Sequence, residues 1–124
     1  ILAVLDWELS TLGNPLGDFA YHMMSWRLGQ DAYRGLGGHD LAALGIPDEA
    51  AYRALYCRRT GRQDIPHWDF YLAYNMFRLA AILQGIMGRV VEGTAANVRA
   101  REAGARARAI AEAGWRQVEA IERR

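Results

Sequence analysis

The stretch that decides the fold reads ILAVLDWELSTLGNPLGDFA and occupies residues 1–20. It begins with five consecutive apolar residues, and such a short apolar run is typical of a buried strand. Asp6 follows directly. The pair Asn14-Pro15 then predicts the start of a helix, because asparagine caps helix N-termini and proline is favoured at the first helical position. The stretch therefore predicts a strand over residues 1–5, an acid at its end and a helix after it.

The rest of the chain predicts further helices. The helix that starts at Asn14-Pro15 keeps apolar residues at helical spacing and is expected to end at Gly29. Residues 35–45 contain four glycines and predict a surface loop. Three more helices are expected, over residues 47–61, 66–91 and 96–121. The expected fold class is thus mainly α, with one short N-terminal strand followed by about four helices.

The third helix, over residues 66–91, is apolar almost all round, as expected of the central helix of a bundle. At about 100° per residue, Asn75, Arg78 and Arg89 project into one narrow sector. Because a buried arginine is costly unless it is paired, this polar stripe is expected to contact either a substrate or a structural partner. The residues alone leave both options open.

The composition excludes several classes of function. All 15 basic residues are arginine, and 14 acidic residues reduce the net charge to +1, which argues against nucleic-acid binding. The single cysteine, Cys57, has no partner for an internal disulfide, so a reducing, cytoplasmic setting is expected. The most apolar stretch, residues 70–91, contains two arginines, an asparagine and a glutamine and is a poor membrane span.

Asp6 is the candidate metal ligand, since an acid that follows a buried strand lies where ligands gather in sheet-containing folds. Phosphoryl transfer requires carboxylates of this kind, because magnesium prefers oxygen ligands and neutralises charge on the phosphates. Composition and spacing alone favour the alternative that Asp6 only caps the turn after an edge strand.

Residues 1–20 resemble the metal-binding segment of the aminoglycoside phosphotransferase and choline kinase-like family, which has a protein-kinase-like fold. Residues 71–93 are similar to the long central helix of its branch found in acyl-CoA-dehydrogenase-linked and other bacterial phosphotransferases. The resemblance implies that Asp6 occupies the position of the Asp-Phe-Gly aspartate of protein kinases and ligates Mg²⁺. It also implies that Asp18 supports the catalytic loop from the start of the following helix.

The same resemblance implies that residues 1–124 are the C-terminal helical part of an enzyme that transfers the γ-phosphate of ATP to a hydroxyl group of a small molecule, with Mg²⁺. The family's His-Gly-Asp catalytic loop, its glycine-rich loop and its phosphate-pairing lysine have no counterpart in the chain, which contains no lysine. The chain is therefore expected to hold no catalytic residue and to be inactive alone.

Two questions stay open at this level. The alternative function is a non-catalytic helical module that binds a protein partner through the loop around His39 or through the last helix, whose arginines otherwise predict a solvated flank. The acceptor is also open: the family includes kinases for aminoglycosides, macrolides, choline, ethanolamine, sugars and hydroxyacyl compounds. The scattered acids disfavour a polycationic aminoglycoside, and a homodimer is compatible with the sequence.

Overall fold

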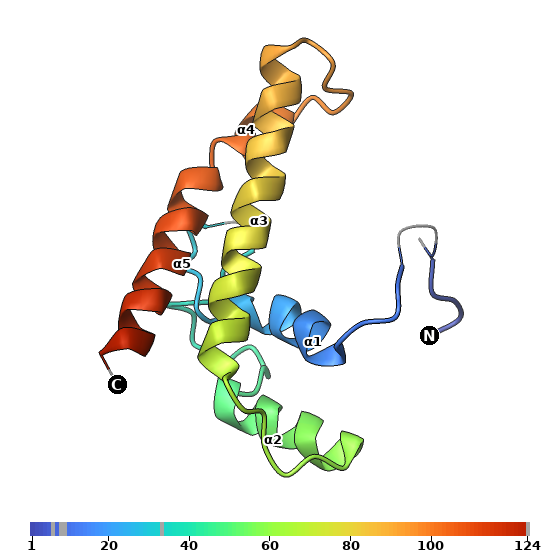
Figure 1. Cartoon of the computed structure of the whole chain (residues 1–124), viewed down its shortest axis with the longest axis vertical. Helices are drawn as coiled ribbons and strands as arrows, with labels where there is room; N and C mark the ends of the chain where they lie inside the picture. Colours follow the sequence, from blue (N-terminus) through green and yellow to red (C-terminus); the bar gives the residue numbers. More distant parts are fainter. Residues whose placement is uncertain (6, 8–9, 33, 124) are drawn as a thin grey trace.

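The computed structural model describes residues 1–5, 7, 10–32 and 34–123, and this part of the chain is mainly helical (Figure 1). The predicted fold class is therefore confirmed. The elements are α1 (Pro15–Met23), the 3₁₀ turn η2 (Met24–Trp26), α2 (Glu49–Thr60), α3 (Trp68–Val91), α4 (Ala100–Gly104) and α5 (Ala107–Glu122). None of the helices in the described ranges is long and apolar enough to cross a membrane.

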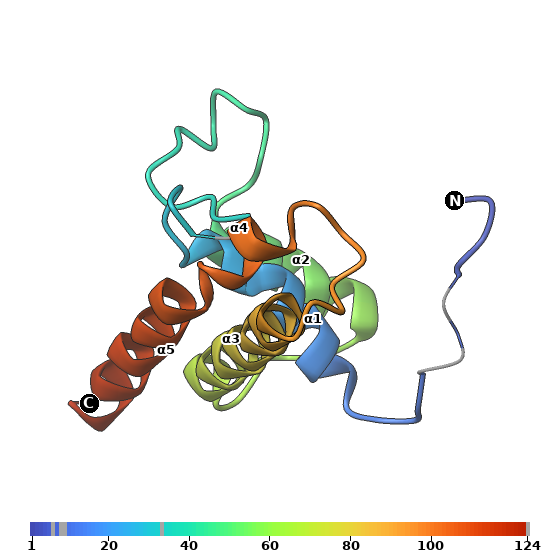
Figure 2. The same cartoon turned by 90° about the horizontal axis from the view of Figure 1, so that it is seen from above.

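The predicted strand over residues 1–5 does not form. These residues have no regular secondary structure, and the side chains of Ile1, Leu2 and Leu5 are almost fully exposed. A strand is stable only where a neighbouring strand satisfies its backbone groups, and the described part of the chain contains no strand that could pair with it. Figure 2 shows this segment extending away from the helices.

The start of α1 follows the prediction, and its end does not. The side chain of Asn14 accepts a hydrogen bond from the backbone N–H of Leu16 at 3.0 Å, and Pro15 is the first helical residue. The α-helix ends at Met23, before Gly29, because the chain tightens into the 3₁₀ turn η2. This turn directs Trp26 and the residue after it, Arg27, towards α2.

The prediction for α2 is confirmed at both ends. The Asp48 carboxylate accepts a hydrogen bond from the Ala51 N–H at 2.7 Å, and Gly61 ends the helix with φ of 69°, a left-handed conformation that favours glycine. Large side chains join α2 to α1: the rings of Phe19 and Tyr56 stack with their centroids 3.8 Å apart.

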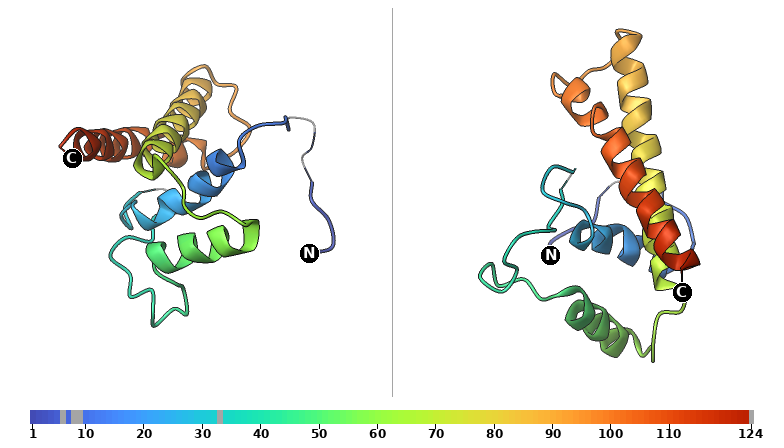
Figure 3. Two further views of the ribbon diagram at one scale, coloured as in Figure 1. Left: turned by 60° about the horizontal axis from the view of Figure 1, so that its bottom comes forward. Right: turned by 90° about the vertical axis from the view of Figure 1, so that its left-hand side faces the viewer.

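The long helix α3 lies at the centre of the bundle, with α5 beside it and antiparallel to it and α1 crossing its first half (Figures 1 and 3). The prediction that α3 is enclosed on all sides is only partly correct, because Phe70, Tyr74 and Phe77 are more than half exposed. The core joins α1, α3 and α5 and includes Leu16, Ala20, Met23, Leu72, Met76, Leu79, Leu83, Ala107 and Ile110.

The predicted last helix is two helices. The chain leaves α4 at Gly104 and begins α5 at Ala107, without a proline or a side-chain cap between them. At Gly104, α4 packs closely on α3: a Cβ atom there would be 2.8 Å from Cβ of Met87 and 3.0 Å from its Cα. Glycine has the lowest helix propensity of any residue but proline, so a break at this position is physically reasonable.

Gly104→Ala is expected to destabilise the protein by about 1–3 kcal/mol, because the added methyl group overlaps Met87 and α4 must move away from α3. The matched control is Gly85→Ala in α3, where nothing lies within 4 Å of the new Cβ. That control should stabilise by up to about 1 kcal/mol through helix propensity. Urea unfolding measures both changes, and equal stabilisation of the two variants would contradict the close packing of α4 on α3.

Candidate functional site

The predicted metal ligand, Asp6, lies outside the described residues, and side-chain hydrogen bonds anchor the start of α1, which comes after it in the sequence. Asn14 caps α1 with its side-chain oxygen, Oδ1, and its Nδ2 donates to the phenol oxygen of Tyr71 in α3, at 2.8 Å. Asn75, one turn further along α3, donates to the carbonyl oxygen of Gly17 at 3.0 Å. These two hydrogen bonds fix the start of α1 on the first half of α3.

Asn75 is fully buried, and its hydrogen bonds are all made by its NH₂ group. Nδ2 donates to the carbonyl oxygens of Gly17 and Tyr71, and Oδ1 has no partner among the described residues. Exchanging the amide's oxygen and nitrogen would not help, because both neighbours are acceptors. An unpaired buried acceptor costs about 1–3 kcal/mol. The attachment of α1 to α3 through Asn75 therefore includes this cost at Oδ1.

The other predicted site residues lie in three different surroundings. Asp18 is exposed in the first turn of α1, where the helix dipole favours a carboxylate. Arg78 is exposed and places its guanidinium over the ring of Tyr21, 5.3 Å from the centroid. Arg89 lines a pocket near the end of α3. The structure thus brings Asn75 to α1 and directs Arg78 and Arg89 to other contacts.

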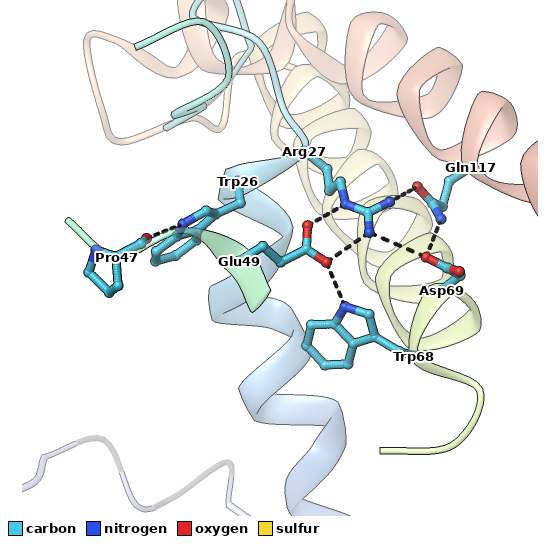
Figure 4. Close-up of polar contacts among 7 residues, drawn as sticks. All are labelled: Trp26, Arg27, Pro47, Glu49, Trp68, Asp69 and Gln117. Carbon is cyan, nitrogen blue, oxygen red and sulfur yellow. Dashed lines mark hydrogen bonds and ion pairs between the residues drawn. The ribbon is translucent and has the colours of Figure 1, made fainter. Parts of the chain in front are cut away.

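The most connected polar cluster in the described part of the chain centres on Arg27 (Figure 4). Its guanidinium makes a bidentate contact with Glu49, the first residue of α2, in which the Nη2 to Oε1 distance is 2.7 Å. Arg27 also donates to Oε1 of Gln117 in α5 at 3.1 Å and lies 3.4 Å from Oδ1 of Asp69 in α3. One arginine side chain therefore contacts residues of three helices.

Two further hydrogen bonds complete this cluster. The indole N–H of Trp68 donates to Oε1 of Glu49 at 2.8 Å, and Nε2 of Gln117 donates to Asp69 at 3.0 Å. Both carboxylates are largely buried: the side chains of Glu49 and Asp69 are 20% and 16% exposed. Arg27 offsets only one of these two negative charges, so Arg27, Glu49 and Asp69 together carry a net charge of about −1, and the hydrogen bonds from Trp68 and Gln117 help to stabilise the carboxylates.

The electrostatics of the cluster favour its ionised form. Burial of Glu49 works against ionisation, but hydrogen bonds from Arg27 and Trp68 and the charges of Arg27 and Arg53 outweigh it, so the pKa of Glu49 is lowered from 4.5. The hydrogen bond to Glu49 is the main reason that the pKa of Arg27 is raised, with smaller contributions from the charges of Glu49 and Asp69. Both groups remain charged at neutral pH.

The lowered pKa of Glu49 predicts a loss of stability in acid. A carboxylate with a folded-state pKa below its unfolded value stabilises the protein fully above the unfolded value, near 4.5 for Glu49. This contribution is lost as the pH falls through the lower, folded-state pKa. Urea unfolding between pH 7 and pH 3 should show that Glu49→Gln removes part of the acid dependence, while Glu112→Gln, at an exposed i,i+4 pair, leaves it unchanged. Identical pH profiles for wild type and Glu49→Gln would contradict the assignment.

The described residues do not form a complete metal site. No group of three or more His, Cys, Asp or Glu side chains in these ranges is arranged to hold a metal ion. The carboxylates of Glu49 and Asp69 are already engaged by Arg27. Asp6 lies outside these ranges, and its role as a metal ligand remains a prediction.

The sequence did not reveal the Arg27 cluster. Its members come from the end of η2 and the starts of α2 and α3, together with Gln117 in the middle of α5. No spacing or motif links four such segments. The one signal available was Gln117, a polar residue on the apolar face of the last helix, which is buried in the structure.

Comparison with known proteins gives similar sequences over nearly the whole chain. Acyl-CoA dehydrogenase family member 10 of Mus musculus is 42% identical over 117 residues, which are 93% of this chain and 11% of that protein. Acyl-CoA dehydrogenase family member 11 of Homo sapiens is 37% identical over 94 residues, 75% of this chain and 12% of that protein. The chain spans about a tenth of the length of these relatives. No protein-family model matches it.

One solved structure is also similar. A crystal structure from Ralstonia eutropha, described as "a putative aminoglycoside phosphotransferase", superposes with a TM-score of 0.85 at 62% identity. The match covers 95% of this chain and 36% of the solved chain. The Ralstonia protein is therefore similar to this chain in both sequence and fold.

Proposed function

We propose, since this chain belongs to the aminoglycoside phosphotransferase-like family of kinase-like proteins, that it forms the helical C-terminal part of an enzyme that transfers the γ-phosphate of ATP to a hydroxyl group of a small molecule. The observation that carries the proposal is the 62% identity and TM-score of 0.85 with the Ralstonia protein. This similarity favours an enzyme over the alternative of a non-catalytic interaction module.

The proposed role of Asp6 is to supply one carboxylate ligand to Mg²⁺. When bound, the ion would neutralise charge on the phosphates of ATP as the γ-phosphoryl group is transferred. The described residues support this role indirectly, because Asn14 and Asn75 hold the start of α1 on α3 and so limit where the preceding segment can lie. Asp18, in the first turn of α1, is proposed to support the catalytic loop supplied by the rest of the enzyme.

The remaining parts of the reaction are assigned to residues outside this chain. The chain has no lysine and no His-Gly-Asp loop, so neither the phosphate-pairing cation nor the catalytic base of the family has a counterpart in it. The 124-residue chain alone is therefore proposed to be inactive. The acceptor is proposed to be a small alcohol other than a polycationic aminoglycoside, because the acids of the chain are scattered among arginines.

The test is an acceptor screen with the full-length enzyme, ATP and Mg²⁺, in which ADP release is measured against a panel of sugars, amino alcohols, hydroxyacyl compounds and aminoglycosides. The expected result is ADP release that requires both Mg²⁺ and one class of acceptor, with none from the isolated 124-residue chain. Transfer by the isolated chain, or the absence of acceptor-dependent ADP release across the whole panel, would contradict the proposal.

A further inference from the structure

A pocket of about 540 Å³ lies at the far end of the bundle from α1, between the last turns of α3 and the helix α4. The loop that joins the two helices, residues 92–99, forms part of its wall and is drawn in orange in Figure 1. Arg89, which lines this pocket, and Asn75 are about 21 Å apart along the axis of α3, at a rise of about 1.5 Å per residue. The pocket is thus separate from the start of α1. The proposed metal ligand, Asp6, precedes α1 in the sequence.

Three arginines line this pocket: Arg89 from α3, Arg99 from the loop and Arg106 from the turn before α5. The carboxylate of Glu102 also lines it and pairs with Arg106 at 3.0 Å. Neither Arg89 nor Arg99 has an acidic partner among the described residues. The charges at the pocket therefore sum to about +2, and two guanidinium groups keep their donors free for a ligand.

Apart from Asn97, the rest of the lining is apolar. Ile86 and four alanines, Ala95, Ala96, Ala100 and Ala103, provide carbon surface between the arginines. Such a combination suits a ligand that is an anion at one end and hydrocarbon at the other, because the apolar surface would gain nothing from a hydrated inorganic ion.

We propose that this pocket binds a phosphate monoester of a small apolar alcohol. Guanidinium groups match the oxygens of a phosphate in a bidentate geometry, and a phosphate monoester carries a charge of about −1.5 to −2 near pH 7, close to the opposite of the pocket's charge. A carboxylate would satisfy only half of that charge. The pocket is distinct from the proposed metal site, since its lining includes neither Asp6 nor Asp18.

The test is isothermal titration of the full 124-residue chain with phenyl phosphate as the probe, compared with benzoate, benzyl alcohol and inorganic phosphate. Phenyl phosphate should bind most tightly, because it alone combines the dianion with the apolar group. The double variant Arg89→Ala and Arg99→Ala should weaken its binding by at least about tenfold, the loss expected for charge-assisted hydrogen bonds. Arg116→Ala, an exposed arginine of α5 outside the pocket, is the matched control and should bind as wild type does.

The outcomes are distinct. Tightest binding of phenyl phosphate, with loss in the double variant and not in the Arg116→Ala control, supports the proposal. No binding at millimolar concentration would overturn it, as would equal losses in the double variant and the control, which would indicate non-specific attraction to arginines. Benzoate binding as tightly as phenyl phosphate would overturn the assignment to a phosphate ester. Circular dichroism of the double variant verifies that its helices are retained, and a normal spectrum is expected because both side chains are exposed.

Discussion

Asp6→Asn in the full-length enzyme is expected to lower kcat by about 100-fold or more and to leave the fold intact. In phosphoryl transfer the protein mainly positions groups and stabilises charge, so the loss of one metal carboxylate removes stabilisation of the transition state itself. An asparagine keeps one oxygen but not the negative charge that Mg²⁺ prefers. The measurement is acceptor-dependent ADP release as a function of Mg²⁺ concentration, and the variant should also require more Mg²⁺.

The matched control is Asp64→Asn, which removes the same charge at a carboxylate that is 73% exposed and pairs only with Arg53. It should retain wild-type turnover. Near-normal turnover and Mg²⁺ dependence of Asp6→Asn would refute the metal-binding role, and equal losses in the two variants would show that the effect is not specific to Asp6.

Arg27→Ala is expected to destabilise the protein by about 2–4 kcal/mol. The substitution removes the guanidinium that pairs with the largely buried carboxylates of Glu49 and Asp69, and breaking one side of such a pair costs more than the pair itself contributes. The expected loss of stability is smaller than for a fully buried ion pair, because a third of the Arg27 side chain is exposed. Urea unfolding followed by circular dichroism measures the change.

Two further variants test the geometry of this cluster. Arg27→Lys keeps the charge but cannot make the bidentate contact with Glu49, so it should recover only part of the lost stability. Arg108→Ala is the control, because this arginine and its partner Glu112 are both exposed, and it should cost less than about 1 kcal/mol. A loss for Arg27→Ala no larger than that for Arg108→Ala would show that the cluster does not hold the helices together.

The sequence predicted elements well where a single residue determines a boundary. Asn14 and Asp48 cap helices through hydrogen bonds that depend only on the next few residues, and Gly61 ends α2 by adopting positive φ. The break between α4 and α5 was not predictable in this way. It occurs in an alanine- and arginine-rich stretch that favours an unbroken helix, and it coincides with the close packing of Gly104 on Met87, a tertiary contact.

The candidate site shows the same difference between features set by neighbouring residues and features set by tertiary contacts. Asp6 was proposed from the residues that adjoin it and from resemblance, and it lies outside the described residues. Asn75, Arg78 and Arg89 share a sector of α3 in projection, but what each of them contacts depends on α1, on Tyr21 and on α4. Helical periodicity gives the direction of a side chain and not the identity of its neighbour. For the same reason, the sequence did not show that two arginines of the predicted solvated flank, Arg99 and Arg106, line a pocket.

The attachment of α2 has a consequence for local opening. This helix meets its neighbours through ring faces, such as Phe19 against Tyr56, and through the contact between Glu49 and Arg27, whereas α5 lies directly along α3. Segments with few close backbone contacts exchange their amide protons through openings that cost less than global unfolding. We therefore expect the amides of α2 to exchange through openings of lower free energy than those of α3 and α5, which leave the central helix pair folded.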